Sequence, residues 1–291
     1  MSSRACFLFV LLSACAPGGD DDDDDDESID GGGQDASLDL DAGTDAHVMP
    51  DAAPVEDDVL VWAHSADTLF SFEPRTDRVT SIGPFRTAEG DAAPQMTDLA
   101  VDSAGELYAC SNDALFAVDP ETATTTWITD FDVEADVRFY GLTFLPEGVL
   151  DPGVEVLVGA TSNGDYYRID ESTGATELIG RFSDDYGLSG DIVSVEDAGT
   201  FATVKRDDLD TDVLVQLDPE SGEVDPIGTG IGFTNLFGLA YFRQRLYGFS
   251  SRGELIWIDI DTGEGSIVTD ETGSDQFWGA GVTTIAPTGP F

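Results

Sequence analysis

The chain has little of what catalysis and covalent cross-linking usually need. Its 291 residues include three cysteines and two histidines, and its one lysine is Lys205. Three cysteines do not make a disulfide scaffold, so the fold must depend on its hydrophobic core. His47 and His64 are too few for a histidine-cluster metal site and give a histidine-dependent catalytic triad almost no material.

Basic residues are scarce as well. Twelve Lys and Arg stand against 59 Asp and Glu, which gives a formal net charge of -47 at pH 7. A field of this sign repels phosphate backbones and anionic lipid surfaces. We therefore expect no nucleic-acid partner, whereas cations and basic partners remain compatible with the charge.

The apolar run at the N-terminus is too short to cross a bilayer as a helix. It extends over the eight residues from Ala5 to Leu12, whereas a spanning helix needs about 20 residues. A run of this length after a positive charge, here Arg4, is typical of a secretory signal. The sequence therefore predicts export.

The end of this run, Leu12-Ser13-Ala14-Cys15, resembles the bacterial lipobox. The resemblance implies that residues 1–14 are a lipoprotein signal peptide and that the thiol of Cys15 carries a diacylglycerol, which anchors the protein to a membrane. Ala16 stands where Asp would signal inner-membrane retention, so the resemblance implies the outer membrane. The alternative is ordinary cleavage after Ala14-Cys15-Ala16, which leaves Pro17 as a poor start for the mature chain.

Residues 16–58 have the composition of a tether. They contain 17 acidic residues, including the run from Asp20 to Asp26, and no Lys or Arg. Like charges repel one another, and there is little apolar surface to offset the entropy of the chain, so we expect an extended, disordered spacer. A surface-routing or cation-binding role is the alternative. Residues 59–291 carry the remaining 42 acidic and 11 basic residues and are the folded part.

The folded part contains a repeat that predicts an all-β, five-bladed β-propeller. The repeated unit is an alternating apolar strand that ends in an acid and a turn, and the acids are 46, 51, 48 and 41 residues apart. This period is near the roughly 40–50 residues of a four-stranded propeller blade. The five copies are Leu69 to Pro74, Leu115 to Pro120, Tyr166 to Glu171, Leu214 to Pro219 and Leu255 to Ile260.

The ends of the repeat array predict how the ring closes. The first copy has strands at Val59 to Ala63, Thr68 to Phe72 and Val79 to Ile82 but lacks an inner strand, and the unassigned strand Gly281 to Ile285 has the missing pattern. A C-terminal strand that completes the first blade removes two exposed sheet edges. The predicted blades are residues 59–85 with 277–286, 96–131, 139–182, 187–230 and 236–270.

The repeated acids are interpreted as structural turn residues, and the alternative is that they bind calcium. At Asp119, Asp170, Asp218 and Asp259 the third strand turns into the fourth, where an Asp side chain accepts backbone N–H bonds and Gly takes positive φ. The alternative is calcium, because Asp208-x-Asp210-x-Asp212 and Asp259-x-Asp261 copy the start of a calcium loop. Both lack the Gly at the bend and the closing Glu. We therefore assign no metal ligands and no cofactor, and keep calcium as an open alternative.

Other reactive side chains have plain structural interpretations. His64 lies beside Ser65 and Asp67, but neighbours in a loop rarely face one another as a relay. Lys205 on a strand is typical of a surface charge, and Cys110 is typical of a small core residue. No catalytic residue is assigned, and the sequence does not favour an enzyme.

Candidate binding residues gather where the inner strands start. In propellers these starts share one face with the loops between second and third strands, around the mouth of the central channel. Aromatic residues here either pack between blades or form contacts for a ligand. The candidates are Asp98, Tyr140, Asp185, Tyr186, Phe237 and Trp278.

Three functions remain compatible with these features. The leading one is a membrane-anchored envelope lipoprotein whose propeller is an interaction platform for a protein partner in the envelope. The alternative is a binding protein for a small molecule or glycan, with its site at the mouth of the channel. A propeller hydrolase or lyase that uses carboxylates such as Asp98 and Asp185 is the third.

The anchor has a direct test. Replacing Cys15 by Ser removes the thiol that the lipobox resemblance assigns to the lipid, so the variant should move from the membrane fraction to the soluble fraction of the envelope. Fractionation followed by immunoblotting measures the shift. A Cys15→Ser protein that stays in the membrane fraction as completely as the parent contradicts lipidation at this residue.

Overall fold

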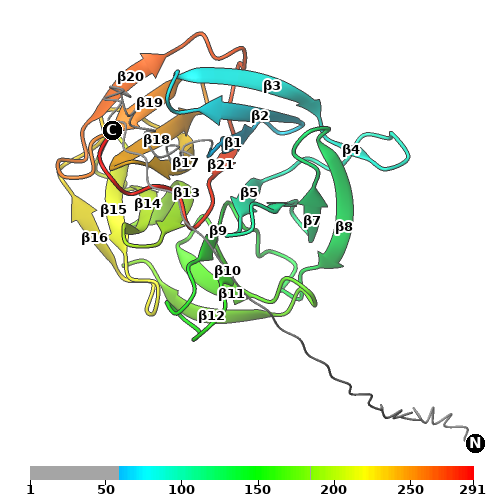
Figure 1. Cartoon of the computed structure of the whole chain (residues 1–291). Coiled ribbons are helices and arrows are strands. Elements are labelled where there is room, and N and C mark those ends of the chain that lie inside the picture. Colours follow the sequence, from blue (N-terminus) through cyan, green and yellow to red (C-terminus); the bar gives the residue numbers. More distant parts are fainter. Residues whose placement is uncertain (1–58, 184) are drawn as a thin grey trace, which may run out of the picture. The chain divides into compact units, whose positions relative to one another are not determined.

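The computed structural model describes residues 59–183 and 185–291 and builds them entirely from strands, turns and loops. The predicted signal peptide, Cys15 and the predicted tether lie outside the described residues. Five antiparallel sheets stand around a common axis, as Figure 1 shows. This arrangement confirms the five-bladed β-propeller. In the described ranges no helix is long and apolar enough to cross a membrane.

Each blade has four antiparallel strands, ordered from the axis outward. The first blade has β21 (Gly279–Gly281), β1 (Val61–His64), β2 (Thr68–Glu73) and β3 (Arg78–Pro84). The second has β5 (Asp98–Val101), β6 (Leu107–Cys110), β7 (Ala114–Val118) and β8 (Thr124–Asp130), with β4 (Arg86–Thr87) parallel to β8 at its edge.

The other three blades repeat the pattern without an added strand. The third has β9 (Gly141–Leu145), β10 (Val156–Ala160), β11 (Asp165–Ile169) and β12 (Thr176–Arg181). The fourth has β13 (Gly187–Val195), β14 (Gly199–Lys205), β15 (Val213–Leu217) and β16 (Val224–Ile227). The fifth has β17 (Leu236–Phe242), β18 (Arg245–Ser250), β19 (Leu255–Ile258) and β20 (Gly265–Thr269).

A C-terminal strand closes the ring, as predicted, but it is an earlier segment than the sequence pattern indicated. β21 pairs with β1 in the register Gly279 to His64 and Gly281 to Trp62. The residues that follow leave the sheet, and Thr283 bridges instead to Val101 of the second blade. Of the segment Gly281 to Ile285, Gly281 alone therefore belongs to the strand, while Val282 and Thr284 are buried beyond it and Ile285 is exposed.

Residues 282–291, called the tail from here on, tie one end of the ring together. Thr283 donates to the carbonyl of Asp102 at 2.8 Å, and the amide of Glu196 donates to the carbonyl of Thr284 at 2.7 Å. The amide of Arg243 donates to the carbonyl of Pro287 at 2.7 Å. The hydroxyl of Thr284 also donates to the carboxylate of Glu155 in the third blade. The tail therefore binds the second, third, fourth and fifth blades, and Figure 1 shows this red segment running over the inner strands toward β18.

Large apolar side chains fill the space between neighbouring sheets. Phe72 of the first blade meets Tyr247 and Phe249 of the fifth edge to face, with ring centroids 4.9 and 5.8 Å apart. All three rings are buried. Such contacts hold each blade against the next, which keeps the inner strands in fixed positions around the axis.

The two ends of the ring are different. Inner strands of all blades run in the same direction, because three strands of alternating direction lie between one inner strand and the next. The inner strands start at one end, which we call the upper end. They finish at the other, the lower end, where the tail lies.

Close approach of the inner strands requires glycine at Gly190. A Cβ there would lie 1.8 Å from the carbonyl oxygen of Leu236 on the neighbouring blade, whereas a Cβ at Gly289 in the tail would meet nothing within 4 Å.

We expect Gly190→Ala to destabilise the domain by about 3 kcal/mol, because backbone of two blades must separate to admit the methyl group. Gly289→Ala is the matched control and should change the free energy of unfolding by under about 0.5 kcal/mol. Urea unfolding followed by tryptophan fluorescence measures both. Equal stability of the two variants would show that the inner strands are not tightly packed at this point.

Candidate functional site

Five equivalent backbone positions surround the axis at the upper end. Each is the residue just before a buried apolar residue of an inner strand, and together they comprise two acids and three glycines. They are Asp98, Gly141, Asp191, Gly238 and Gly279, which precede Leu99, Leu142, Ile192, Leu239 and Ala280. Gly279 leaves room at the axis for an acid, since a Cβ there would lie 2.1 Å from Oδ1 of Asp98.

The two acids bind the inner strands of all five blades. Asp98 accepts the amide of Leu99 at 2.8 Å in its own blade and that of Leu142 at 2.6 Å in the third. Asp191 accepts one amide from each of the fourth, fifth and first blades. These donors are Ile192 at 2.6 Å, Leu239 at 2.8 Å and Ala280 at 3.3 Å.

Asp98 and Asp191 also share a side-chain hydrogen bond and are both completely buried. Burial raises the pKa of Asp98 well above its usual value, and repulsion from Asp191 adds to the rise. Burial likewise raises the pKa of Asp191, against the opposing effect of the hydrogen bonds it accepts. At neutral pH the pair therefore keeps a proton, and Asp98 donates it to Asp191.

His64 and Cys110 lie beside this pair, and burial shifts the pKa of both side chains away from its usual value. Burial lowers the pKa of His64 to about 4, so its ring is neutral, with Nδ1 donating to the carbonyl of Ser65 at 2.7 Å. Its Nε2 is 4.0 Å from Asp98 and has no hydrogen-bond partner. Burial raises the pKa of Cys110 to about 12. Ser65 donates to Asp67 rather than to His64, so these three side chains form no relay.

A cavity of about 320 Å³ opens above the buried pair. Each blade contributes to its wall the residue directly before its axis position, so the carboxyl pair and the three glycines lie beneath the cavity. Those five residues are Thr97, Tyr140, Gly190, Phe237 and Trp278, and the wall is completed by Ser162, Leu188, Ser189 and Lys205. We call this cavity the upper mouth.

The structure brings together three of the six binding residues predicted from the sequence. Tyr140, Phe237 and Trp278 line the upper mouth. Asp98 lies beneath the cavity, bound to backbone amides, and is not exposed to it. Asp185 is exposed and Tyr186 packs against Arg206, whose guanidinium is 5.5 Å from the ring centroid; neither residue lines the cavity.

Sequence reasoning missed Lys205 and Gly190 as parts of the wall. Gly190 belongs to a bulge in β13, where the register shifts between Leu188 and Ile192, so Tyr186-Gly187 is not the fourth-blade counterpart of Phe237-Gly238. Lys205 ends β14, on the same face as the starts of the inner strands. Its position in the repeat and its status as the one lysine of the chain were the available signals.

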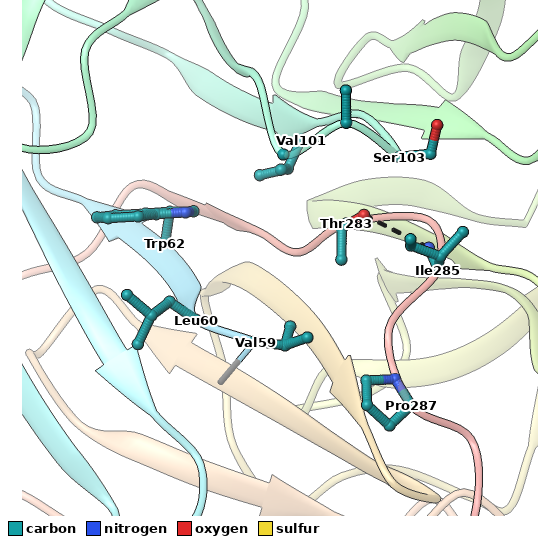
Figure 2. A pocket seen from close by; sticks show the side chains of 10 residues that line it. Val59, Leu60, Trp62, Val101, Ser103, Thr283, Ile285 and Pro287 are labelled. Atoms are coloured by element: carbon teal, nitrogen blue, oxygen red, sulfur yellow. Dashed lines mark hydrogen bonds between the residues drawn. The ribbon is translucent and has the colours of Figure 1, made fainter. Parts of the chain in front are cut away.

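A second hollow, of about 680 Å³, lies at the lower end. Figure 2 shows Trp62, Leu60 and Val59 on one side of it and Ile285 and Pro287 of the tail on another. Its wall carries no charged side chain. It is larger than the upper mouth but lacks the convergent polar groups that usually orient a ligand.

The candidate calcium residues have other partners in the structure. Asp208 pairs with Arg206 at 2.8 Å, and Asp212 accepts the amide of Leu236 at 2.9 Å. Asp259 caps its turn by accepting the amides of Asp261 and Thr262 at 3.0 and 2.9 Å. Over residues 59–183 and 185–291, no group of three or more His, Cys, Asp or Glu side chains is placed to hold a metal ion.

The other repeated acids cap their turns in the same way as Asp259. Asp119 and Asp218 accept the amide two residues on, in both cases at 2.8 Å. Asp170 accepts two amides and the hydroxyl of Ser172, and these hydrogen bonds lower its pKa to about 2. The repeated acids are therefore structural turn residues.

No protein-family model and no curated protein matches the chain. Among solved structures, it is similar to a protein of unknown function from Bacteroides caccae (9% identity, TM-score 0.41, 72% of each chain covered). It is also similar to a structural genomics protein of unknown function from Bacteroides thetaiotaomicron (14%, TM-score 0.46, 72% of this chain and 57% of that one). A third is the calcium-binding protein regucalcin from Agrobacterium tumefaciens (15%, TM-score 0.38, 70% of this chain and 66% of that one). At these values the likenesses carry no argument about function.

The buried pair predicts a specific pH dependence of stability. A carboxyl whose pKa is raised on folding binds more protons in the native state, so it reduces stability as pH rises above the unfolded value, near 4. Asp98→Asn cannot titrate but can still donate to Asp191. Relative to the parent it should therefore become more stable as pH rises from 5 to 8, by up to about 1.4 kcal/mol per pH unit.

The matched control is Glu121→Gln, which removes one exposed acid at a turn. Its unfolding free energy should run parallel to that of the parent across the same pH range. Chemical unfolding at each pH supplies the measurement. If the Asp98→Asn curve also runs parallel, the pair does not hold a proton at neutral pH.

Proposed function

We propose that this protein is an envelope lipoprotein, anchored through Cys15, whose propeller is a binding module that recognises its partner at the upper mouth. The proposal combines the lipobox resemblance and the acidic tether with the geometry of the ring. The observation that supports it most is the upper mouth itself: a cavity with three aromatic side chains and a lysine on its wall.

The upper mouth has the properties of a preformed site. The carboxyl pair beneath it accepts hydrogen bonds from all five blades, and one wall residue of each blade directly precedes an axis position. A rigid site loses little conformational entropy when it binds, which favours affinity. Its volume of about 320 Å³ is at the lower end of the range for ligand cavities.

The direction of the chain supports recognition at this end. Val59, the first described residue, borders the hollow at the lower end. A tether that leads into Val59 would join the domain at the end opposite the upper mouth.

Site-specific photocrosslinking of the full-length protein in its own envelope tests the proposal. A photoreactive phenylalanine replaces Tyr140 at the upper mouth or, as the matched control, Trp127 on β8, whose side chain is also aromatic and exposed. Intact-mass spectrometry detects adducts of any size. We expect a discrete adduct at position 140 and none at position 127.

Two results would contradict the proposal. One is the absence of any adduct at position 140 in a folded, membrane-bound protein. The other is the same set of adducts at both positions, which would indicate non-specific contact with the propeller surface.

A further inference from the structure

We propose that the upper mouth takes a ligand with a carboxylate attached to an apolar or aromatic body, and that Lys205 binds the carboxylate. This inference rests on the proposed function, because it concerns the same cavity. Two sources present such chemistry: a free small acid, and the C-terminal residue of a peptide.

The cavity wall has a single charged side chain, and that charge is positive. Of the nine residues that form the wall, Lys205 alone is charged. Within residues 59–183 and 185–291 no ion pair joins its ammonium group to a carboxylate. In a domain that carries 42 acidic residues and one lysine, the position of that lysine on the cavity wall indicates the sign of the ligand.

Asp212, a candidate counter-ion for Lys205, already has other partners. Asp212 is buried, accepts the amide of Leu236 at 2.9 Å and is also hydrogen-bonded by the hydroxyl of Ser189. Burial raises the pKa of Asp212, and electrostatic attraction by Lys205 opposes this rise. They form no direct pair, which leaves the ammonium group able to bind an anion from the cavity.

The rest of the wall suits an apolar body. Tyr140, Phe237 and Trp278 come from three different blades, and Leu188 adds an aliphatic contact. Aromatic side chains from separate blades can enclose a flat group on more than one side. Ser162 gives the wall a further hydroxyl, which can donate to the second oxygen of a carboxylate.

Because the domain is strongly acidic, binding of an anion at the upper mouth depends on its contact with Lys205. Charges beyond the Debye length of about 8 Å at physiological salt are screened, but those that remain act against an anion. Attraction must therefore come from the local contact. Removing the lysine charge should remove the preference for an acid over its neutral amide.

The test compares matched probes by isothermal titration calorimetry and ligand-observed NMR. The small probes are phenylacetate, phenylacetamide and phenethylammonium; the peptide probes are Gly-Gly-Phe with a free or an amidated C-terminus. We expect at least one free acid to bind about tenfold or more tightly than its amide, since a charged hydrogen bond is lost in the amide. The set in which this preference is larger identifies the source.

Two lysine variants and one control locate the charge. Lys205→Met keeps the apolar stem and should reduce the acid to the affinity of its amide, while Lys205→Arg should keep most of the preference. Arg206→Met removes the neighbouring cation, which does not line the cavity, and should change nothing. Thermal unfolding confirms that each variant is folded.

The outcomes separate this inference from the proposed function. The carboxylate assignment is overturned if neither acid is preferred over its amide, or if Lys205→Met keeps the preference. If it is overturned while the photoreactive group at position 140 still gives its discrete adduct, the upper mouth is a binding site for another chemistry. Loss of both results removes the binding site as well.

Discussion

All five blades of the fold are hydrogen-bonded to two carboxyl groups at its axis. Asp98 and Asp191 accept five backbone amides, one from the inner strand of each blade, and bind each other. Burying two acids is costly, but hydrogen bonds to a charged acceptor are worth about 1.5–3 kcal/mol each, and a fully satisfied network gains rigidity. The five amides would otherwise point into a closed space without partners.

This constraint explains features that look unrelated in the sequence. Gly279 leaves room for the carboxyl of Asp98, whereas Gly141 and Gly238 leave room for the neighbouring inner strands, at Leu188 and Ile192 and at Gly279 and Ala280. The residue before each axis position becomes part of the wall of the upper mouth. The chemistry of the proposed site is thus set by Tyr140, Phe237, Trp278 and Lys205, while its geometry depends on the buried carboxyl pair.

At the lower end the blades are held together by the tail instead of by buried carboxyl groups. There the tail makes hydrogen bonds with all four blades beyond the first, and the ring centroid of Phe291 lies 4.0 Å from the guanidinium of Arg245. β21 and the tail together therefore link the first blade to the rest of the ring at both ends.

Local patterns were sufficient to predict the blades, their number and the closure by a C-terminal strand, because these follow from alternating strands and turn residues such as Asp170 and Gly174. They were not sufficient for the site. Asp98 and Asp191 are 93 positions apart, and their pairing depends on five strands meeting at one axis. The bulge at Ser189 and Gly190 also shifts the fourth blade out of the simple repeat, which hid the equivalence of Asp191 and Gly238.

Hydrogen exchange of the five axis amides tests the central claim most directly. If the carboxyl pair holds all blades, the amides of Leu99, Leu142, Ile192, Leu239 and Ala280 share one opening event. NMR-detected exchange at neutral pH should then give the five amides the same free energy of opening, equal to that of global unfolding. A separate, lower opening energy for any one of them would show that its blade can leave the axis by itself, and would contradict the account.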